Sequence, residues 1–396
     1  MLLADVRQRL FAPSASATPR GIGIELELIP LLATDHRPAL ATKSKTGRST
    51  PAVLSLLAAR EGWIEQPAGD DPSSWLLPDG ARISFEPGGQ IEISTAPMPT
   101  ASAVITTTQA LVRRLREAMS ESGIELLAKG VDPYNDISAV PLQLNRERYA
   151  RMTRYFERIG PSGVRMMRQT AALQINLEHG NDPLGRWRLL NALAPIVVAL
   201  FANSREYAGK STGWASYRSQ LWRTLDRSRT GIPYDSTDPA AAYFDFALRA
   251  QAMRAGDGEG RSFRDWMGDP SVDIAEWSFH LSTLFPEVRP KEFFELRSAD
   301  TIEPDSLAAP VVFVTSLVYD DVTAREAARL LGAPSTDLLE RAGRNGLADP
   351  AIRSLASDLV DCALHGTQRL DGEYFTATHV EDASRYFARA LARDDL

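Results

Sequence analysis

The stretch Gly21-Ile-Gly-Ile-Glu-Leu-Glu-Leu28 alternates apolar side chains with glycine and glutamate. A period of two predicts a β-strand with the apolar side chains on one face and the carboxylates of Glu25 and Glu27 on the other. The rise of a strand separates two such carboxylates by about 6.5–7 Å at their bases. The pair either faces solvent or binds a positively charged group, and the strand by itself leaves both interpretations open.

Other segments show the same alternation. Arg82–Glu86 and Gln90–Ser94 flank a Pro-Gly-Gly turn and predict a hairpin, whereas Leu173–Glu178 and Phe293–Arg297 predict two more strands. Their polar faces carry Glu86, Gln90, Glu92, Ser94, Gln174, Asn176, Glu178, Glu295 and Arg297. If the strands are neighbours, these faces form a wall of oxygen ligands, which suits hard cations such as Mg²⁺ or Mn²⁺. A solvated face is the alternative for each strand taken singly.

A basic and aromatic segment, Trp214–Gly231, supplies candidates for binding anions. Arg218 and Trp222 are four residues apart and share a face of a predicted helix. The planar guanidinium of arginine suits a carboxylate or a phosphate. Arg289 and Lys291 precede the last predicted strand and are further candidates for phosphate contacts, with ordinary surface charge as the alternative. Because Mg²⁺ held by a few carboxylates usually shares its coordination with substrate phosphates, the combination favours nucleotide chemistry.

Long helical segments separate the predicted strands, at 50–61, 100–122, 184–203 and 244–254. From about Ser306 onward the chain is predicted to be helical. Since strand and helix do not alternate regularly, we expect an α+β fold with a mostly antiparallel sheet. We also expect an N-terminal lead-in at residues 1–19 and a single domain at 20–396, whose helical C-terminal part spans about 306–396.

The composition disfavours several classes of protein. The chain has 396 residues, 44% of them hydrophobic and 24% charged, which is ordinary for a globular protein. Its net charge of −7 disfavours a nucleic-acid binder. The single cysteine, Cys362, excludes an intrachain disulfide and fits a reducing cytoplasm. The N-terminus has no apolar signal sequence, and the longest apolar stretch, Leu189–Ala202, is too short to cross a membrane, so we expect a cytoplasmic protein with no membrane partner.

Several motifs resemble one family. Glu86-Pro-Gly-Gly-Gln-Ile-Glu-Ile-Ser94 is similar to the signature of the type 2 (plant-type) glutamate–cysteine ligases. The similarity continues, in the family's order, through the segments 166–177, 200–204, 213–222, 226–231 and 280–290. It covers about residues 20–370. The chain length and the segment Phe294–Asp300 most resemble the family's bacterial, ergothioneine-pathway branch.

The resemblance implies a glutamine-synthetase-like catalytic sheet and an ATP-dependent ligase. In the implied reaction, the γ-carboxylate of L-glutamate takes the γ-phosphoryl group of ATP, giving γ-glutamyl phosphate and ADP. The amine of L-cysteine then attacks, giving γ-glutamylcysteine and phosphate for the biosynthesis of glutathione or ergothioneine. The implied partners are therefore L-glutamate, L-cysteine and ATP, and we expect a monomer or a homodimer.

The resemblance also implies roles for particular residues. By the family pattern, the ligands of Mg²⁺ (or Mn²⁺) are Glu25, Glu27, Glu86, Glu92 and Glu295. Gln174 lies beside them among the cofactor-binding residues, and Arg218 matches the arginine that holds glutamate. The segments that contact ATP or the transferred phosphoryl group contain Arg229, Thr283, Arg289 and Arg297, and Arg297 is expected to act in catalysis with Arg218. Clustered carboxylates repel one another unless divalent metals neutralise them, and arginines opposite them stabilise a phosphoryl group in transfer.

Two other functions remain open at this point. A ligase of the same family could join glutamate to a different amine, because no residue identifies a thiol unambiguously. A non-catalytic homologue that binds ATP without turnover is the second alternative. The presence of all five glutamates argues against the non-catalytic protein.

Overall fold

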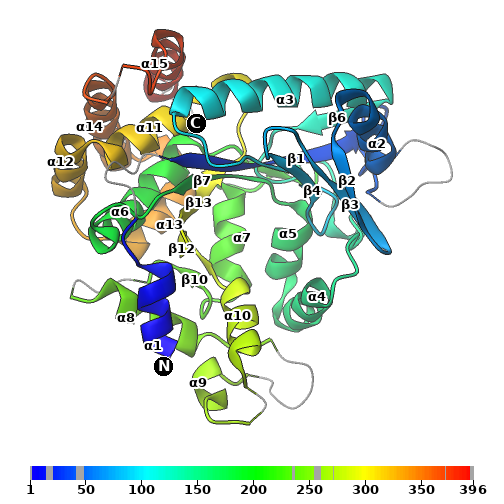
Figure 1. Ribbon diagram of the computed structural model, residues 1–396, viewed down its shortest axis with the longest axis horizontal. Helices are drawn as coiled ribbons and strands as arrows, with labels where there is room; N and C mark the ends of the chain where they lie inside the picture. Colours follow the sequence, from blue (N-terminus) through cyan, green and yellow to red (C-terminus); the bar gives the residue numbers. More distant parts are fainter. Residues whose placement is uncertain are drawn as a thin grey trace.

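The computed structural model describes residues 2–14, 21–41, 49–233, 237–253, 260–270, 272–370 and 372–392. Within them, nine strands form one sheet in the order β12-β13-β7-β1-β5-β4-β3-β2, and β6 also pairs with β1 (Figure 1). Every pairing in that sheet is antiparallel. The predicted α+β fold with a mostly antiparallel sheet is therefore confirmed. The strands of the sheet are β1 Ile22–Leu32, β2 Ile64–Ala68, β3 Asp71–Leu76, β4 Arg82–Phe85, β5 Ile91–Ser94, β6 Ile124–Leu127, β7 Ala172–Leu177, β12 Val288–Pro290 and β13 Phe294–Asp300.

Helices cover the sheet on both sides. In Figure 1, the long helix α3 lies on one side, and α4, α5, α7 and α10 lie on the other. Two short strand pairs, β8 Glu206–Tyr207 with β9 Lys210–Ser211 and β10 Thr230–Gly231 with β11 Phe285–Pro286, stand apart from the main sheet. The main helices are α2 Thr50–Glu61, α3 Ala101–Glu121, α4 Glu147–Ile159, α5 Pro161–Gln169, α6 Pro183–Leu200, α7 Tyr217–Leu225, α8 Pro239–Arg249, α10 Ile274–Ser282, α11 Ala308–Tyr319, α12 Asp321–Leu331, α13 Thr336–Asn345, α14 Pro350–Thr367 and α15 Ala377–Ala392.

The alternation in β1 separates the core from the polar face. The apolar side chains of Ile22, Ile24, Leu26 and Leu28 are all fully buried. Helix α3 packs on β1, and its hydroxyl cap at Thr100 accepts a hydrogen bond from the backbone N–H of Ala103. The opposite face of the sheet is left to the glutamates and their polar neighbours.

Some predicted boundaries differ from the observed ones. Strand β7 ends at Leu177, so Glu178 lies beyond it, and the Glu178 carbonyl oxygen accepts a hydrogen bond from Arg186 at 2.6 Å. The helix expected at 244–254 is α8, which begins at Pro239 because the carboxylate of Asp238 caps it by accepting from the Ala241 N–H. Residue 254 lies outside the described residues. The hairpin of β2 and β3 was not predicted, because Pro67 interrupts the first of these strands.

The first residues of the chain pack against the core. Val6, Leu10 and Phe11 are buried within the main hydrophobic cluster, and the rest of the expected lead-in, residues 1 and 15–19, lies outside the described residues. Helices α11 to α15 occupy residues 308–392, in the part of the chain predicted to be helical. The division into a lead-in and one catalytic domain stays a prediction.

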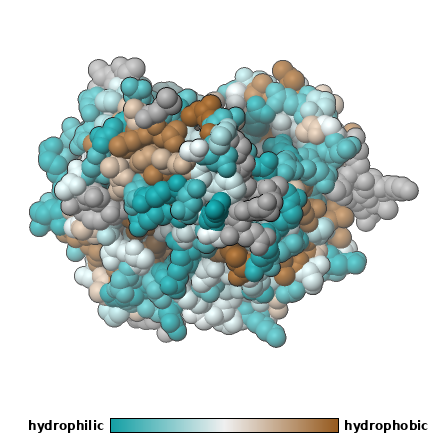
Figure 2. All heavy atoms as spheres, turned by 90° about the horizontal axis from the view of Figure 1, so that it is seen from below, coloured by the Kyte–Doolittle hydropathy of each residue, from teal (hydrophilic) through white to brown (hydrophobic). Residues whose placement is uncertain are grey.

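No single helix in the described parts of the chain is long and apolar enough to cross a membrane. One bent pair, Pro304–Tyr319 with Asp321–Leu331, has sufficient length and apolar composition when taken together, but the two parts meet at 98°. Every residue of α11, which forms most of the first part, is buried in the protein. The face of the molecule seen in Figure 2 is mainly hydrophilic, with smaller apolar patches between the hydrophilic side chains.

Candidate active site

The polar face of the sheet borders a cavity of about 300 Å³. Residues of α4, α5 and α7 complete its lining on the side opposite the strands. The five glutamates predicted as metal ligands all line this cavity: Glu25, Glu27, Glu86, Glu92 and Glu295. Five basic side chains line it as well: Arg148, Arg218, Arg289, Lys291 and Arg297. The predicted polar wall therefore exists as one continuous site.

Strand register brings the carboxylates together. Glu27 lies opposite Glu92 across the β1–β5 pair, and Glu25 lies opposite Gln174 across the β1–β7 pair. Glu295 on β13 lies opposite Asn176 on β7. The period of two puts these side chains on the same face, and the register between strands sets them opposite one another.

Glu86 reaches the cavity through the turn that joins β4 and β5. Its backbone N–H donates to the carbonyl oxygen of Gln90 at 2.8 Å and closes this turn. Gly89 has a φ of +89°, which favours glycine. A Cβ atom at Gly88 would lie 1.9 Å from the carbonyl oxygen of Arg168. Only glycine at position 88 therefore lets the end of α5 lie this close to the turn.

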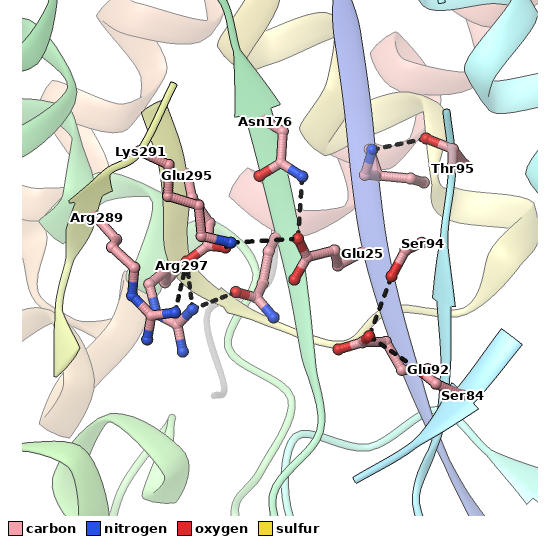
Figure 3. Close-up of polar contacts among 12 residues, drawn as sticks. Glu25, Ser84, Glu92, Ser94, Thr95, Asn176, Arg289, Lys291, Glu295 and Arg297 are labelled. Carbon is pink, nitrogen blue, oxygen red and sulfur yellow. Dashed lines mark hydrogen bonds and ion pairs between the residues drawn. The ribbon is translucent and has the colours of Figure 1, made fainter. Parts of the chain in front are cut away.

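Glu27, Glu86 and Glu92 form the acidic end of the cavity. Burial raises the pKa of Glu27 and of Glu86 to about 7, and that of Glu92 to about 8, and the repulsion among neighbouring carboxylates adds to each shift. The Ala172 N–H donates to Glu27 at 2.8 Å. The Ser94 hydroxyl donates to Glu92 at 3.0 Å (Figure 3). These hydrogen bonds do not neutralise one buried and two half-buried carboxylates, so the acidic end favours binding of a cation.

The donor set at the acidic end fits a hard divalent cation. Its ligands are carboxylate oxygens, which Mg²⁺ and Mn²⁺ prefer, and such an ion would remove the repulsion among them. Within the described residues, no three acidic, histidine or cysteine side chains converge closely enough to hold a metal ion by themselves. Mg²⁺ commonly completes its coordination with water and substrate phosphates. The assignment of the five glutamates as metal ligands therefore stays a prediction.

Glu295 has a different environment from the other four glutamates. It is fully buried and accepts hydrogen bonds from Lys291 and Arg297, and one of its oxygens lies 3.4 Å from Nη1 of Arg289 (Figure 3). Burial alone would raise its pKa, but Arg289, Arg297 and Lys291 hold that pKa well below its ordinary value. Lys291 also lies 3.8 Å from Glu25. We refer to Arg289, Lys291 and Arg297 as the basic end of the cavity.

Arg218 and Arg297 lie against the same indole ring. Their guanidinium carbons are 5.0 and 4.9 Å from the ring centroid of Trp222. Arg218 and Trp222 share one face of α7, as predicted, whereas Arg297 approaches the ring from β13. Arg218 donates to the backbone carbonyl of Arg297 at 2.8 Å, and Arg297 donates to the side-chain oxygen of Gln174 at 2.6 Å. The Nε–H group of each arginine is buried and has no hydrogen-bond partner in the described part of the chain. Both arginines line the cavity, and a guanidinium group suits a carboxylate or a phosphate, so the pair points to an anionic ligand.

Two of the residues predicted to contact ATP lie outside this cavity. Arg229 is fully buried, and its guanidinium donates to Asp226 at 2.7 Å and to the carbonyl oxygen of Thr283 at 3.0 Å. Thr283 is fully buried as well. The structure therefore does not bring these two residues to Arg289 and Gln174, which both line the cavity. The physical reason is that the segment after α7 folds inward and pairs Arg229 with Asp226.

Sequence reasoning missed the wall that faces the sheet. This wall comes from α4 and α5 and consists of Arg148, Tyr149, Met152, Met166 and Met167. Met166 and Met167 lie in a motif that resembles the family, but no role was assigned to them. On α4, the spacing of positions 148, 149 and 152 is that of one helix face, which was the available signal.

A second cavity, of about 480 Å³, adjoins the first. The two share Arg148, Arg289 and Lys291 in their linings. Tyr243 and Phe293 give the second cavity aromatic surface. Together, the two cavities form a space that is acidic at one end, basic in the middle and partly aromatic at the other end.

Fold and site together define an α+β protein whose antiparallel sheet presents carboxylates and arginines to one cavity. The chain belongs to the glutamate–cysteine ligase family 2 (GCS2), whose family model matches residues 22–388. It is 34% identical over 332 residues to the glutamate–cysteine ligase EgtA of Mycolicibacterium smegmatis, a match that covers 78% of this chain and 76% of that protein. It is 32% identical over 347 residues to the chloroplastic glutamate–cysteine ligase of Nicotiana tabacum, covering 80% of this chain and 65% of that protein. The resemblance inferred from the motifs is confirmed, and with it the assignment to an enzyme class, the ligases.

A solved structure supports the fold. The glutamate–cysteine ligase of Francisella tularensis, in complex with AMP, superposes with a TM-score of 0.55 over 94% of this chain and 82% of that chain. The two sequences are 12% identical, so the likeness concerns the fold. The expected glutamine-synthetase-like α+β architecture is confirmed at this level.

Proposed function

We propose that the protein is an ATP-dependent ligase that joins the γ-carboxylate of L-glutamate to the amine of L-cysteine through γ-glutamyl phosphate. One observation carries the proposal: a single cavity holds three carboxylates with raised pKa values, Glu27, Glu86 and Glu92, next to a cluster of arginines. The acidic end suits a divalent cation and the basic end suits anions. Membership of the glutamate–cysteine ligase family supports the choice of substrates. The product would enter the biosynthesis of a low-molecular-weight thiol.

The residues divide the reaction between them. Arg218 and Arg297, which both line the cavity, bind and orient L-glutamate and the phosphoryl group that its γ-carboxylate receives. The carboxylate oxygen forms a bond to the γ-phosphorus of ATP and ADP leaves. The cysteine amine then bonds to the acyl carbon, phosphate leaves, and the amine proton passes to solvent or phosphate. Mg²⁺, when bound by the glutamates, would neutralise phosphate charge, so the protein supplies mainly positioning and electrostatic stabilisation.

The adjoining cavity suits the rest of the nucleotide. Because Arg148, Arg289 and Lys291 line both cavities, a triphosphate that reaches the acidic end from the second cavity passes three cationic side chains. The aromatic surface of Tyr243 and Phe293 suits a nucleoside. This arrangement keeps the γ-phosphate beside the glutamate site and the nucleoside outside it.

Turnover by matched variants tests the proposal. We expect ADP release by the wild-type protein to require Mg²⁺, L-glutamate and L-cysteine together. Glu86→Gln should lower kcat by about 100-fold or more, because it removes a charge from the acidic end. Glu178→Gln is the matched control. It makes the same chemical change at the residue that follows β7, which does not line the cavity, and it should keep wild-type activity. The proposal is wrong if Glu86→Gln is folded by circular dichroism and turns over at a near-normal rate.

The acceptor amine is tested separately. A ligase of the same family with another acceptor would release ADP with glutamate and a different amine but show no dependence on L-cysteine. Identification of the product by mass spectrometry distinguishes γ-glutamylcysteine from other γ-glutamyl amides. A protein that binds ATP without any turnover would identify the non-catalytic alternative.

A further inference from the structure

The cavity has an apolar wall to which the proposed reaction assigns no substrate group. We propose that Tyr149, Met152 and Met167, on α4 and α5, form the pocket for the side chain of the acceptor amino acid and select a small uncharged side chain. This inference rests on the proposed function and specifies which residues determine its acceptor. It concerns the side of the cavity that faces the carboxylates of the sheet.

The two aromatic rings that line the cavity already pack against other side chains of the protein. The Trp222 ring lies under the guanidinium groups of Arg218 and Arg297, at 5.0 and 4.9 Å. Phe285 packs edge-on against Trp222, with ring centroids 5.5 Å apart. Pro87 and Ala172 add little apolar area, because each has a short or compact side chain, so the methionine side chains of α4 and α5 supply most of the remaining apolar lining.

The free surface of this wall is small. Met152 and Met167 are each 3% exposed and Met166 is 7% exposed, so only a small part of each residue faces the cavity. A side chain of one or two heavy atoms can cover such a surface, whereas a longer one would need the wall to move. Thioether sulfur is polarizable and packs well against another soft atom such as a thiol sulfur.

Tyr149 supplies a hydroxyl that forms no hydrogen bond within the described part of the chain. Of the three hydroxyls that line the cavity, Thr170 donates to the carbonyl of Met166 at 2.6 Å and Ser94 donates to Glu92 at 3.0 Å. The Tyr149 hydroxyl has no hydrogen bond in the described part of the chain, although the residue is only 7% exposed. A hydroxyl of a cavity-lining residue without a partner in the protein is available for a ligand. Burial and the nearby carboxylate of Glu86 raise the pKa of Tyr149, so the hydroxyl keeps its proton.

This wall predicts an order of acceptors. A charged side chain would lose its hydration against methionine and is excluded. L-Cysteine and L-2-aminobutyrate have similar size and both should be used, whereas L-serine, with a hydroxyl that needs more partners than Tyr149 alone, should be used less well. L-Leucine is too large for the free surface. Discrimination by a group of this size is usually about 10- to 200-fold.

Steady-state kinetics with matched variants tests the pocket. Met167→Gln should raise the KM for L-cysteine by about tenfold, with the KM values for L-glutamate and ATP changed less than about twofold. Met167→Leu should remain much closer to wild type than Met167→Gln for the cysteine KM. Met267→Gln is the matched control, because Met267 is 47% exposed and lies outside both cavities, and it should keep wild-type constants.

Two more variants keep the test decisive if Met167→Gln does not fold. Tyr149→Phe should reduce the preference for L-cysteine over L-2-aminobutyrate, since only the thiol interacts with the hydroxyl. Met167→Ala should improve kcat/KM for the longer acceptor L-norvaline relative to L-cysteine, a gain that misfolding cannot produce. An unchanged acceptor order in these folded variants, or a change in the glutamate KM instead of the cysteine KM, overturns the inference and leaves the proposed function intact. A wild-type protein that forms no γ-glutamyl product with any amine overturns the proposed function and the acceptor pocket with it.

Discussion

Arg218 illustrates how a single side chain is fixed before any substrate binds. Its Nη2 donates to the Arg297 carbonyl at 2.8 Å, its guanidinium lies over Trp222, and its Nη1 is 3.9 Å from the buried carboxylate of Asp300. Ser204 and Ser216 hold that carboxylate by hydrogen bonds of 2.7 and 2.9 Å. Because the protein already fixes the guanidinium plane, a carboxylate meets a preorganised donor.

Replacing Arg218 by lysine should therefore damage glutamate binding more than its charge suggests. Lysine keeps a positive charge but loses the planar fork and the stacking on Trp222. We expect Arg218→Lys to raise the KM for L-glutamate at least about tenfold, because hydrogen bonds to charged groups contribute about 1.5–3 kcal/mol. The KM for ATP should change little. Initial rates at varied glutamate and saturating ATP measure the effect.

The control for this variant lies on the same helix. Arg223 on α7 donates to Glu340 at 2.6 Å and does not line the cavity. Arg223→Lys should leave the glutamate KM unchanged. Equal effects of the two lysine variants would show that Arg218 acts through the stability of α7 and not through contact with glutamate.

The turn between β4 and β5 couples an element boundary to the site. Gly88 lies against the end of α5, where an added Cβ would meet the Arg168 carbonyl at 1.9 Å. Because backbone atoms cannot rotate away as a side chain can, Gly88→Ala should separate the turn from α5. We expect a loss of about 1–3 kcal/mol of unfolding free energy in urea. We also expect a drop in turnover, because Glu86 and Glu92 flank this turn.

Gly372→Ala provides the comparison, since a Cβ there meets no atom within 4 Å. It should leave the urea midpoint and the turnover near their wild-type values. If Gly88→Ala matches it in both measurements, the close contact between the turn and α5 does not constrain the site.

At this level the sequence predicted the sheet better than its surroundings. The alternation in β1 and β5 identified Glu25, Glu27 and Glu92, because a period of two fixes both the element and the face of each side chain. A helical period does not show which neighbour a helix face meets, and so the Arg148–Met152 face of α4 was missed. Glu178 fits the alternation but follows the last residue of β7 and lies outside the cavity. The inward fold of Arg229 depends on its pairing with Asp226, a tertiary contact that a motif does not contain.

Across the whole molecule, the site combines carboxylates with opposite pKa shifts. Burial raises the pKa of Glu27, Glu86 and Glu92 to about 7 or 8, whereas nearby cations lower the pKa of Glu295 in spite of its burial. An acid with a raised pKa holds more protons in the folded state than in the unfolded state. Such a group therefore lowers the free energy of unfolding as the pH rises. The lowered pKa of Glu295 acts in the other direction and costs stability only as the pH falls below about 4.5.

These signs predict the dependence of stability on pH and on metal. In the presence of EDTA, the midpoint of thermal unfolding should be highest near pH 5 and should fall as the pH rises from about 5 to 8, because Glu27, Glu86 and Glu92 lose their protons in the folded state. Binding of Mg²⁺ or Mn²⁺ displaces those protons. The stabilisation by metal should therefore be larger at pH 8 than at pH 6. Scanning calorimetry in both conditions, with KCl at matched ionic strength, measures the difference.

Glu92→Gln separates the acidic end from other titrating groups, because it removes the carboxylate with the highest of the three raised pKa values. In EDTA this variant should unfold at a higher temperature than wild type at pH 8 but not at pH 5, since only the ionised glutamate repels Glu86. It should also gain less from Mg²⁺ at pH 8. A wild-type protein with the same midpoint from pH 6 to 8 in EDTA, or an equal response to Mg²⁺ at both pH values, would contradict a divalent-cation site at the acidic end.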